Sequence, residues 1–228
     1  MTCGTISGSA DYRRVTEIDL SAVMNIAGTL PVLSHLGEMT KLDVSFSFIS
    51  GTIPPSISIL SKLKTLRFYN SKLTGTIPSS LGSMSKLEFL SLYNNQLIGT
   101  IPSTLGSLSK LFELNLFSNQ LIGTIPSTLG SLSELFGLNL SSNQLIGIIP
   151  LLNQSSLHNI RLQSNYLTMG SLAEVPASTF SADSLSSFGT VDLRDNCLKF
   201  RHPLNPDYNA DPVRCNGKQT SNISGSLI

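Results

Sequence analysis

The sequence has no tryptophan, only 13% charged residues and a net charge of +1 over 228 residues. Because no basic stripe is present, nucleic acid is not expected as a partner. No window of about 18 apolar residues occurs, so we expect no membrane span within this chain. The first residues lack a charged stretch followed by an apolar run, so no signal peptide is visible. The chain has three cysteines, and this odd number suggests that the disulfide partner of one of them is missing.

The most informative stretch is a tandem copy of 24 residues, at positions 97–120 and 121–144. The copies differ at three places, namely Lys110/Glu134, Glu113/Gly137 and Phe117/Ser141. A unit of this size cannot bury a core alone, so such units must stack on one another. The same period extends on both sides, because the proline of the Ile-Pro pair recurs every 24 residues at Pro54, Pro78, Pro102, Pro126 and Pro150.

Each unit has the pattern L-x-x-L-x-L-x-x-N-x-L-x-G-x-I-P, in which L-x-L predicts a short strand. In residues 114–116 the two leucines point inward and Asn115 points outward, and successive strands form a parallel concave sheet. The glycines at positions 51, 75, 99, 123 and 147 are expected in turns that need a positive φ or a close backbone approach. The Ser-rich segment S-x-L-G-S-L-S predicts a 3₁₀ turn or a single α-turn on the convex side.

This pattern, shared in one register by about eight units over residues 13–198, resembles the leucine-rich repeat, and its G-x-I-P tail resembles the plant-type subclass. The resemblance implies an α/β repeat solenoid. We therefore expect a right-handed, curved leucine-rich repeat superhelix with a concave parallel β-sheet and a short 3₁₀ or irregular convex side.

The resemblance also implies caps at both ends, because a solenoid needs its exposed core covered. Residues 1–12 would be a partial N-terminal cap, in which Cys3 is the second of a cysteine pair whose first member lies upstream of Met1. A buried or free thiol is the alternative for Cys3. Residues 199–217 would form a C-terminal cap stapled by a Cys197–Cys215 disulfide, and residues 218–228 a disordered tail.

The turn asparagine has a predicted structural role. Its side-chain amide can satisfy buried backbone groups of neighbouring turns, as a ladder along the stack. The ladder positions are Asn95, Asn119, Asn143, Asn165 and Asn196. Ser47 and Ser71 stand at the equivalent positions of two earlier units, and we expect those turns to be looser or bridged by water.

The outward-facing strand positions carry the candidate ligand site. One column reads Ser21, Ser45, Tyr69, Tyr93, Phe117, Ser141, Gln163 and Arg194, with three consecutive aromatic residues. Exposed aromatic area and Arg are typical of interaction hot spots, although strands also favour aromatic residues for their own packing. The predicted patch on the concave face is Arg67, Tyr69, Phe89, Tyr93, Glu113 and Phe117. Two of the three differences between the tandem copies fall on this face.

Catalysis is not indicated. His35, His158 and His202 fall in different structural positions, and no metal-binding spacing or catalytic triad pattern appears. Three sequons occur, at Asn139, Asn153 and Asn222. Because Asn139 projects from the concave sheet, either it is unmodified or the ligand uses the end of the sheet from Tyr69 to Phe117.

The chain is similar to the ectodomains of plant-type leucine-rich repeat receptor-like proteins and kinases, and to small secreted relatives such as polygalacturonase-inhibiting proteins. The resemblance implies a non-enzymatic recognition module without cofactor or metal, which binds a peptide, protein or glycan at the cell surface or outside the cell. The alternatives are a secreted inhibitor of a cell-wall hydrolase, or an intracellular scaffold. The sequence leaves the oligomeric state and the ligand's identity open.

Overall fold

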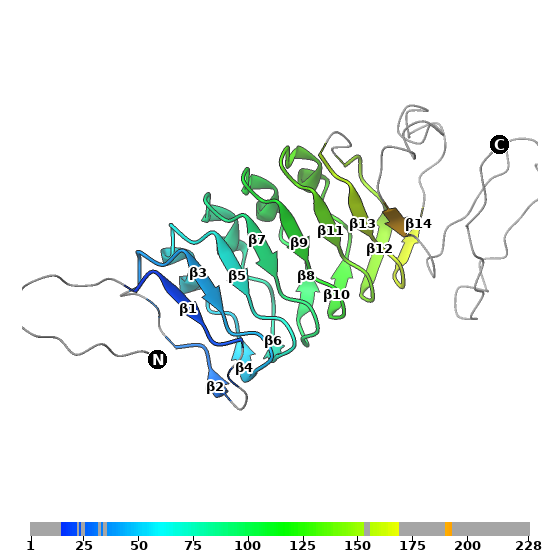
Figure 1. Ribbon diagram of the computed structural model, residues 1–228. Helices are drawn as coiled ribbons and strands as arrows, with labels where there is room; N and C mark the ends of the chain where they lie inside the picture. Colours follow the sequence, from blue (N-terminus) through cyan, green and yellow to red (C-terminus); the bar gives the residue numbers. More distant parts are fainter. Residues whose placement is uncertain are drawn as a thin grey trace, which may run out of the picture.

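The computed structural model describes residues 15–168 apart from residues 22, 24–25, 32, 34–35 and 153–155, together with the backbone of residues 190–192. Over this part the chain is a solenoid, in which successive coils stack and place their strands side by side (Figure 1). The expected caps, tail and Cys197–Cys215 disulfide lie outside the described residues, as do Cys3, Asn153, Asn196 and Asn222.

The concave face is a single parallel sheet with one short strand from each coil, as predicted. Its described strands are β1 (Glu17–Asp19), β3 (Lys41–Asp43), β5 (Thr65–Arg67), β7 (Phe89–Ser91), β9 (Glu113–Asn115), β11 (Gly137–Asn139), β13 (Asn159–Arg161) and β15 (Thr190–Asp192), in that order. Equivalent residues lie opposite each other, for example Leu114 and Leu138. The register therefore converts sequence spacing into straight columns of side chains across the sheet.

A second layer of strands follows the turn of each coil, which the sequence pattern did not predict. One sheet contains β2 (Ala27–Thr29), β4 (Phe48–Thr52) and β6 (Lys72–Thr74), and another contains β8 (Ile98–Thr100), β10 (Gln120–Gly123), β12 (Gln144–Ile148) and β14 (Tyr166–Thr168). A single parallel bridge, Thr76 to Ile98, connects the two sets. Partners here are about 22 residues apart, as for Ile122 and Thr100, so this layer is offset relative to the repeat.

The convex side consists of short 3₁₀ helices, as expected from its Ser-rich segments. They are η1 (Pro55–Ile59), η2 (Ser79–Ser83), η3 (Ser103–Ser107) and η4 (Ser127–Ser131). Each follows the Ile-Pro pair, whose proline is in the extended conformation, with φ −64° and ψ 129° at Pro102. Proline thus ends the second strand and starts the turn, because its φ is fixed and it donates no hydrogen bond.

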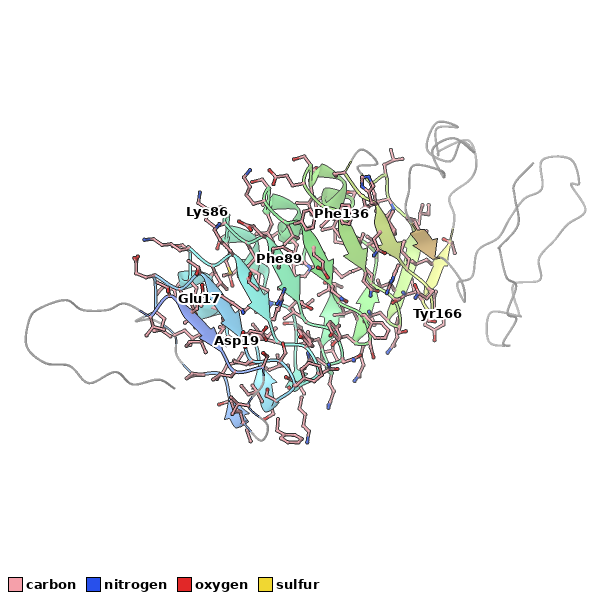
Figure 2. All side chains as sticks on the ribbon, viewed as in Figure 1. Glu17, Asp19, Lys86, Phe89, Phe136 and Tyr166 are labelled. Atoms are coloured by element: carbon pink, nitrogen blue, oxygen red, sulfur yellow. The ribbon has the colours of Figure 1, made fainter. Side chains whose placement is uncertain are left out.

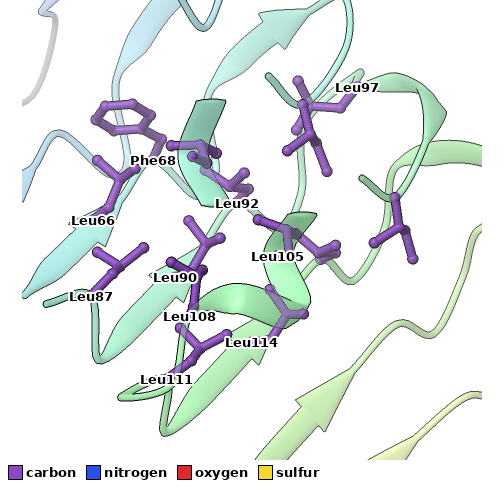
Figure 3. Close-up of a cluster of buried hydrophobic side chains, with 14 of the residues drawn as sticks. Leu66, Phe68, Leu87, Leu90, Leu92, Leu97, Leu105, Leu108, Leu111 and Leu114 are labelled. Carbon is purple, nitrogen blue, oxygen red and sulfur yellow. The ribbon is translucent and has the colours of Figure 1, made fainter. Parts of the chain in front are cut away.

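The core lies between these layers and is built mainly of leucine (Figure 3). Within one coil, Leu90 on β7, Leu92 directly after it, and Leu105 and Leu108 on the convex side are all fully buried. Each buried leucine contributes about 1.5–3 kcal/mol relative to exposure. Because every coil buries its leucines against the next, the hydrophobic core is continuous along the solenoid.

The glycine of the G-T-I-P segment has two roles. At Gly99, φ is 77°, a conformation that favours glycine, as predicted. In addition, a Cβ at Gly99 would lie 2.9 Å from the Cγ2 methyl of Thr76 in the preceding coil. The same contact recurs at Gly123, with Thr100. Glycine therefore lets the threonine of one coil pack onto the backbone of the next.

Four turn asparagines each make the same set of hydrogen bonds. The Nδ2 of Asn119 donates to the carbonyl oxygens of Leu92, Leu116 and Phe117 at 3.0, 3.1 and 3.3 Å. Its Oδ1 accepts from the Leu97 amide at 3.1 Å. Equivalent bonds are made by Asn95, Asn143 and Asn165. Each amide thus satisfies otherwise unpaired backbone groups in its own coil and the preceding one.

The two serine-containing turns are bonded differently. Ser47 Oγ and Ser71 Oγ lie 3.1 Å apart and form a hydrogen bond with each other. Ser47 Oγ also accepts from the Ile49 amide at 3.3 Å. A hydroxyl carries a single donor proton, whereas the asparagine amide carries two donor protons and an oxygen acceptor. These two turns therefore have fewer bonds between coils than the four asparagine turns.

Candidate ligand-binding face

Aromatic side chains form a continuous row along the concave face. Tyr69 and Tyr93 stack with ring centroids 4.4 Å apart and an interplanar angle of 8°. Phe117 continues the row, 6.3 Å from Tyr93, and Phe46 meets Tyr69 edge-on at 5.2 Å. These four residues follow successive strands of the large sheet. The 24-residue period aligns Tyr69, Tyr93 and Phe117, whereas Phe46 lies one position later in its own coil. Sequence reasoning singled out Tyr69, Tyr93 and Phe117, and Phe46 extends the row.

The remaining predicted patch residues lie beside this row. Arg67 is positioned over the Phe89 ring, with its Cζ 6.0 Å from the ring centroid. Its Nη1 lies 3.8 Å from a carboxylate oxygen of Asp43, which is almost fully buried. Glu113 is exposed on β9, opposite Phe89 on β7. The structure thus brings together all six residues of the predicted patch on one face.

The ionisation of Tyr93 reflects this crowding. Burial raises the pKa of the Tyr93 hydroxyl above its ordinary value, and the neighbouring Tyr69 and Glu113 act in the same direction. Arg67 acts in the opposite direction but more weakly. The hydroxyl therefore stays protonated at neutral pH and remains able both to donate and to accept a hydrogen bond.

Two positions of the aromatic column are not part of the exposed surface. Ser45 and Ser141 were expected to face outward, but both side chains are buried. Both side chains are short, and in Ser141 local bonding adds to this. Ser141 Oγ donates to Asn139 Oδ1 at 2.6 Å, so the hydroxyl folds back onto the sheet. The aromatic row consequently ends at Phe117.

A second aromatic row lies where the strands of the large sheet begin, at the opposite strand ends from the first row. The sequence did not predict it. Phe112 and Phe136 stack at 5.1 Å with an interplanar angle of 4°, and His158 stacks on Phe136 at 5.0 Å. Figure 2 labels Phe136, directly before β11, and Phe89, on β7 two coils earlier; the Phe112 ring lies between them, 5.8 Å from that of Phe89. Phe112 and Phe136 are 43% and 42% exposed. Their 24-residue spacing was the available signal, because each directly precedes a concave strand.

Between this second row and the middle of the sheet lies a hollow of about 270 Å³. We call it the Gly137 hollow, because β11 presents Gly137 between Glu113 on β9 and Asn159 on β13. Its other polar lining residues are Asn115, Asn139 and Arg161. The hollow exists because the second tandem copy has glycine where the first has glutamate.

The described sequon asparagine, Asn139, lies in this hollow. Its Oδ1 accepts from the Ser141 amide at 3.2 Å and from the Ser141 hydroxyl. Asn115 makes the corresponding bond to the Phe117 amide at 3.2 Å. In both cases the oxygen is bonded to the turn. A glycan on Asn139 would fill the hollow, so glycosylation and ligand binding there exclude each other.

The described residues contain no cluster of His, Cys, Asp or Glu that could hold a metal ion. Over the same part of the chain, no helix is long and apolar enough to cross a bilayer. His158 is the histidine that the structure describes, and its Nδ1 lies 2.7 Å from the carbonyl oxygen of Ser156. The chemistry of this face is therefore that of apolar rings, amides and a few charges.

Family models agree with this architecture. The model of the leucine-rich repeat domain of the EGF-like domain-containing protein ComC matches residues 3–107, and the general Leucine Rich Repeat model matches residues 110–132. No curated protein matches the chain.

Solved structures resemble it closely. The plant peptide hormone receptor RGFR1, in complex with RGF2, is 31% identical with a TM-score of 0.69, over 81% of this chain and 29% of that chain. The leucine-rich repeat ectodomain of the receptor kinase SOBIR1 from Arabidopsis thaliana is 35% identical with a TM-score of 0.54, over 56% of this chain and 72% of that chain. A plant ice-binding protein is 28% identical with a TM-score of 0.62, over 81% of this chain and 57% of that chain.

These matches define the class. The chain belongs to the leucine-rich repeat proteins, and within them to the plant type, with receptor-kinase ectodomains among its structural relatives. It spans about a third or less of the length of the peptide-hormone receptor chains that it matches.

Proposed function

We propose that the chain is a non-enzymatic recognition module that binds an extended peptide or protein segment on its concave face, outside the cell. The observation that carries the proposal is the row Phe46, Tyr69, Tyr93 and Phe117, flanked by Arg67 and Glu113. Aromatic residues and Arg are the side chains that most often dominate interface energies. The plant receptors RGFR1 and HAESA, solved in complex with peptide hormones, support the same assignment.

The stacking of the rings favours a peptide over a glycan. Tyr69 and Tyr93 cover each other's faces at 4.4 Å, so their edges and hydroxyl groups are what a ligand meets. A sugar ring packs best on an open aromatic face. A peptide, in contrast, uses the hydroxyls for its main-chain groups and the ring edges for its apolar side chains.

The test starts from a phage-displayed library of random dodecapeptides selected on the immobilised protein. Selected peptides, labelled with fluorescein, are titrated by fluorescence anisotropy. Tyr93→Ala should weaken binding by about 2 kcal/mol or more. It should lower the free energy of unfolding only by the loss of its ring contacts with Tyr69 and Phe117, about 0.5–1.5 kcal/mol each. Leu92→Ala is the matched control, because its fully buried side chain should affect folding by about 2–5 kcal/mol. Peptides that bind the Tyr69/Tyr93/Phe117 triple-alanine protein as tightly as the parent would contradict the proposal.

A second candidate function is supported by the outer face of β8, β10 and β12. There Ile98, Ile122 and Ile146 are each about half exposed, and Thr100 and Thr124 are exposed beside them. Residues 97–109 and 121–133 contain no charged residue. Neighbouring strands lie about 4.8 Å apart, and the offset of this layer places the Ile122 methyl groups opposite the Thr100 hydroxyl. A regular, uncharged array of this kind can order water, and one structural relative is a plant ice-binding protein.

Ice binding is tested by microscopy of ice recrystallisation in dilute protein. If the outer sheet binds ice, the parent slows crystal growth and the Ile98→Lys/Ile122→Lys double variant does not. The Tyr69/Tyr93/Phe117 triple-alanine protein is the matched control and should behave as the parent. Equal crystal growth with the parent and with buffer would exclude this second function.

A further inference from the structure

We propose that the Gly137 hollow is a subsite for a single apolar side chain of an extended peptide, bordered by a negative charge on one side and a positive charge on the other. This proposal rests on the proposed peptide-binding function. It adds a second contact region that lies beyond the Tyr69–Phe117 row, toward the C-terminal coils. It also specifies which residue types the peptide carries there.

The size and walls of the hollow set the kind of side chain. Its 270 Å³ lies below the roughly 300–1,000 Å³ of pockets that hold whole ligands, so it suits one side chain. The exposed edges of Phe112 and Phe136 form its apolar wall. The backbone at Gly137 forms part of the floor, since no side chain covers it. An apolar side chain would therefore lose water against rings and backbone there.

Two amides face the ligand's main chain. The Oδ1 atoms of Asn115 and Asn139 accept from turn amides, as described above, which fixes both side chains. Their Nδ2 groups have no hydrogen-bond partner among the residues that the structure describes, and both side chains line the hollow. They lie opposite each other on neighbouring strands. They can donate to carbonyl oxygens of an extended peptide that runs along the solenoid.

The charges at the two ends specify the neighbouring ligand residues. Glu113 and Arg161 line the hollow from strands β9 and β13, and neither forms an ion pair with another described residue. Two strand spacings across the sheet and two residues along the strands separate them, about 12 Å in total, which an extended peptide covers in a little more than three residues. The charge complement is thus a basic residue and an acidic residue about three positions apart, with the apolar residue between them.

The experiment fills the hollow without adding charge. Gly137→Gln places a long neutral side chain in it, and Gly137→Ala is the matched control that adds a single methyl group. Both should fold, because a Cβ at Gly137 would make an ordinary 3.5 Å contact with Glu113 Cγ, and the preceding coil has a glutamate at this strand position. Equal thermal unfolding midpoints confirm this before binding is measured.

The probes are the dodecapeptides selected from the random library on the parent protein. We expect the selected sequences to share the basic, apolar and acidic pattern. Gly137→Gln should weaken their binding at least about tenfold, with Gly137→Ala within about threefold of the parent. Arg161→Ala should weaken peptides with the acidic residue more than versions in which that residue is replaced by serine.

The outcomes separate the two proposals. Peptides that lose affinity for the Tyr69/Tyr93/Phe117 triple-alanine protein but bind Gly137→Gln normally would overturn the subsite and leave the peptide-binding function standing. Peptides that bind both proteins normally would overturn both proposals, as would a library that yields no binder. A parallel panel of cell-wall oligosaccharides completes the test. Binding of an oligosaccharide that Gly137→Gln abolishes, without any such peptide, would assign the hollow to glycans and overturn the proposed occupant.

Discussion

The coils formed by residues 97–120 and 121–144 share 21 of 24 residues and have the same order of strands and 3₁₀ helix. The three positions at which they differ nevertheless give them different surfaces. Their core leucines are buried alike, and Asn119 and Asn143 make the same bonds. None of the three differences involves these buried leucines or turn asparagines. Lys110 and Glu134 pair with each other at 2.6 Å, Gly137 opens the hollow, and Ser141 ends the aromatic row. The repeat thus separates residues that hold the fold from residues that vary its surface.

The largest expected effect tests whether the hydrophobic cores of the two tandem coils are equivalent. Leu114→Ala and Leu138→Ala each remove a fully buried side chain at paired positions of β9 and β11. Each should lower the free energy of unfolding by about 2–5 kcal/mol, and by similar amounts, because the buried leucines within the two coils are the same and only the neighbour on β13, Ile160, differs from leucine. Urea titrations monitored by circular dichroism measure both. A clear difference between the two variants would show that the coils are not packed alike.

The next effect concerns the hydrogen bonds of the turns. Asn119→Ala would leave three carbonyl oxygens and the Leu97 amide without their side-chain partner, at a cost of roughly 1–3 kcal/mol. Asn143→Ala should cost the same. Ser71→Ala should cost less, since Ser71 Oγ bonds chiefly to Ser47. If Ser71→Ala destabilised the protein as much as Asn119→Ala in urea titrations, the interpretation of the asparagine ladder would be wrong.

Much of the fold could be predicted from the sequence, because residues one repeat apart lie opposite each other in the large sheet. The 24-residue repeat correctly predicted the parallel strands and the positive φ of glycines such as Gly99. Its short Ser-rich segment predicted a 3₁₀ turn or a single α-turn, and the structure has the 3₁₀ form. The repeat also brought Tyr69, Tyr93 and Phe117 into one column. The second layer of strands was missed, because Ile98-Gly99-Thr100 lacks a clear alternation of apolar and polar residues.

The surface was harder to predict for physical reasons. Burial of Ser45 and Ser141 depends on neighbouring side chains, which a column of the sequence does not specify. The Gly137 hollow is defined by a missing side chain, so it becomes visible only when the walls on three strands are known.

A smaller effect is expected where the aromatic row ends. Phe117→Ser gives the first copy the residue of the second copy at this position. Phe117 is half-buried and contacts Tyr93, so the loss in unfolding free energy should be about 0.5–1.5 kcal/mol. Binding of library-selected peptides, measured by anisotropy, should fall about tenfold if Phe117 is a contact residue. Unchanged affinity would restrict the binding row to Phe46, Tyr69 and Tyr93.

The smallest effect concerns the ion pair between the copies. Lys110→Glu or Glu134→Lys alone places like charges beside each other and should lower the melting temperature slightly, while the double reversal should restore it. Because the hydrogen bond from Lys110 to Glu134 raises the pKa of Lys110, the pair stabilises the folded protein below the ordinary pKa of lysine. This contribution should disappear as the pH rises through the raised pKa of the folded protein. It should also weaken with salt, because both side chains are largely exposed. Melting curves of the four proteins at low and high salt measure this coupling. If the double reversal melts no higher than the single variants, the two positions act independently, and this difference between the copies carries no interaction across the repeat.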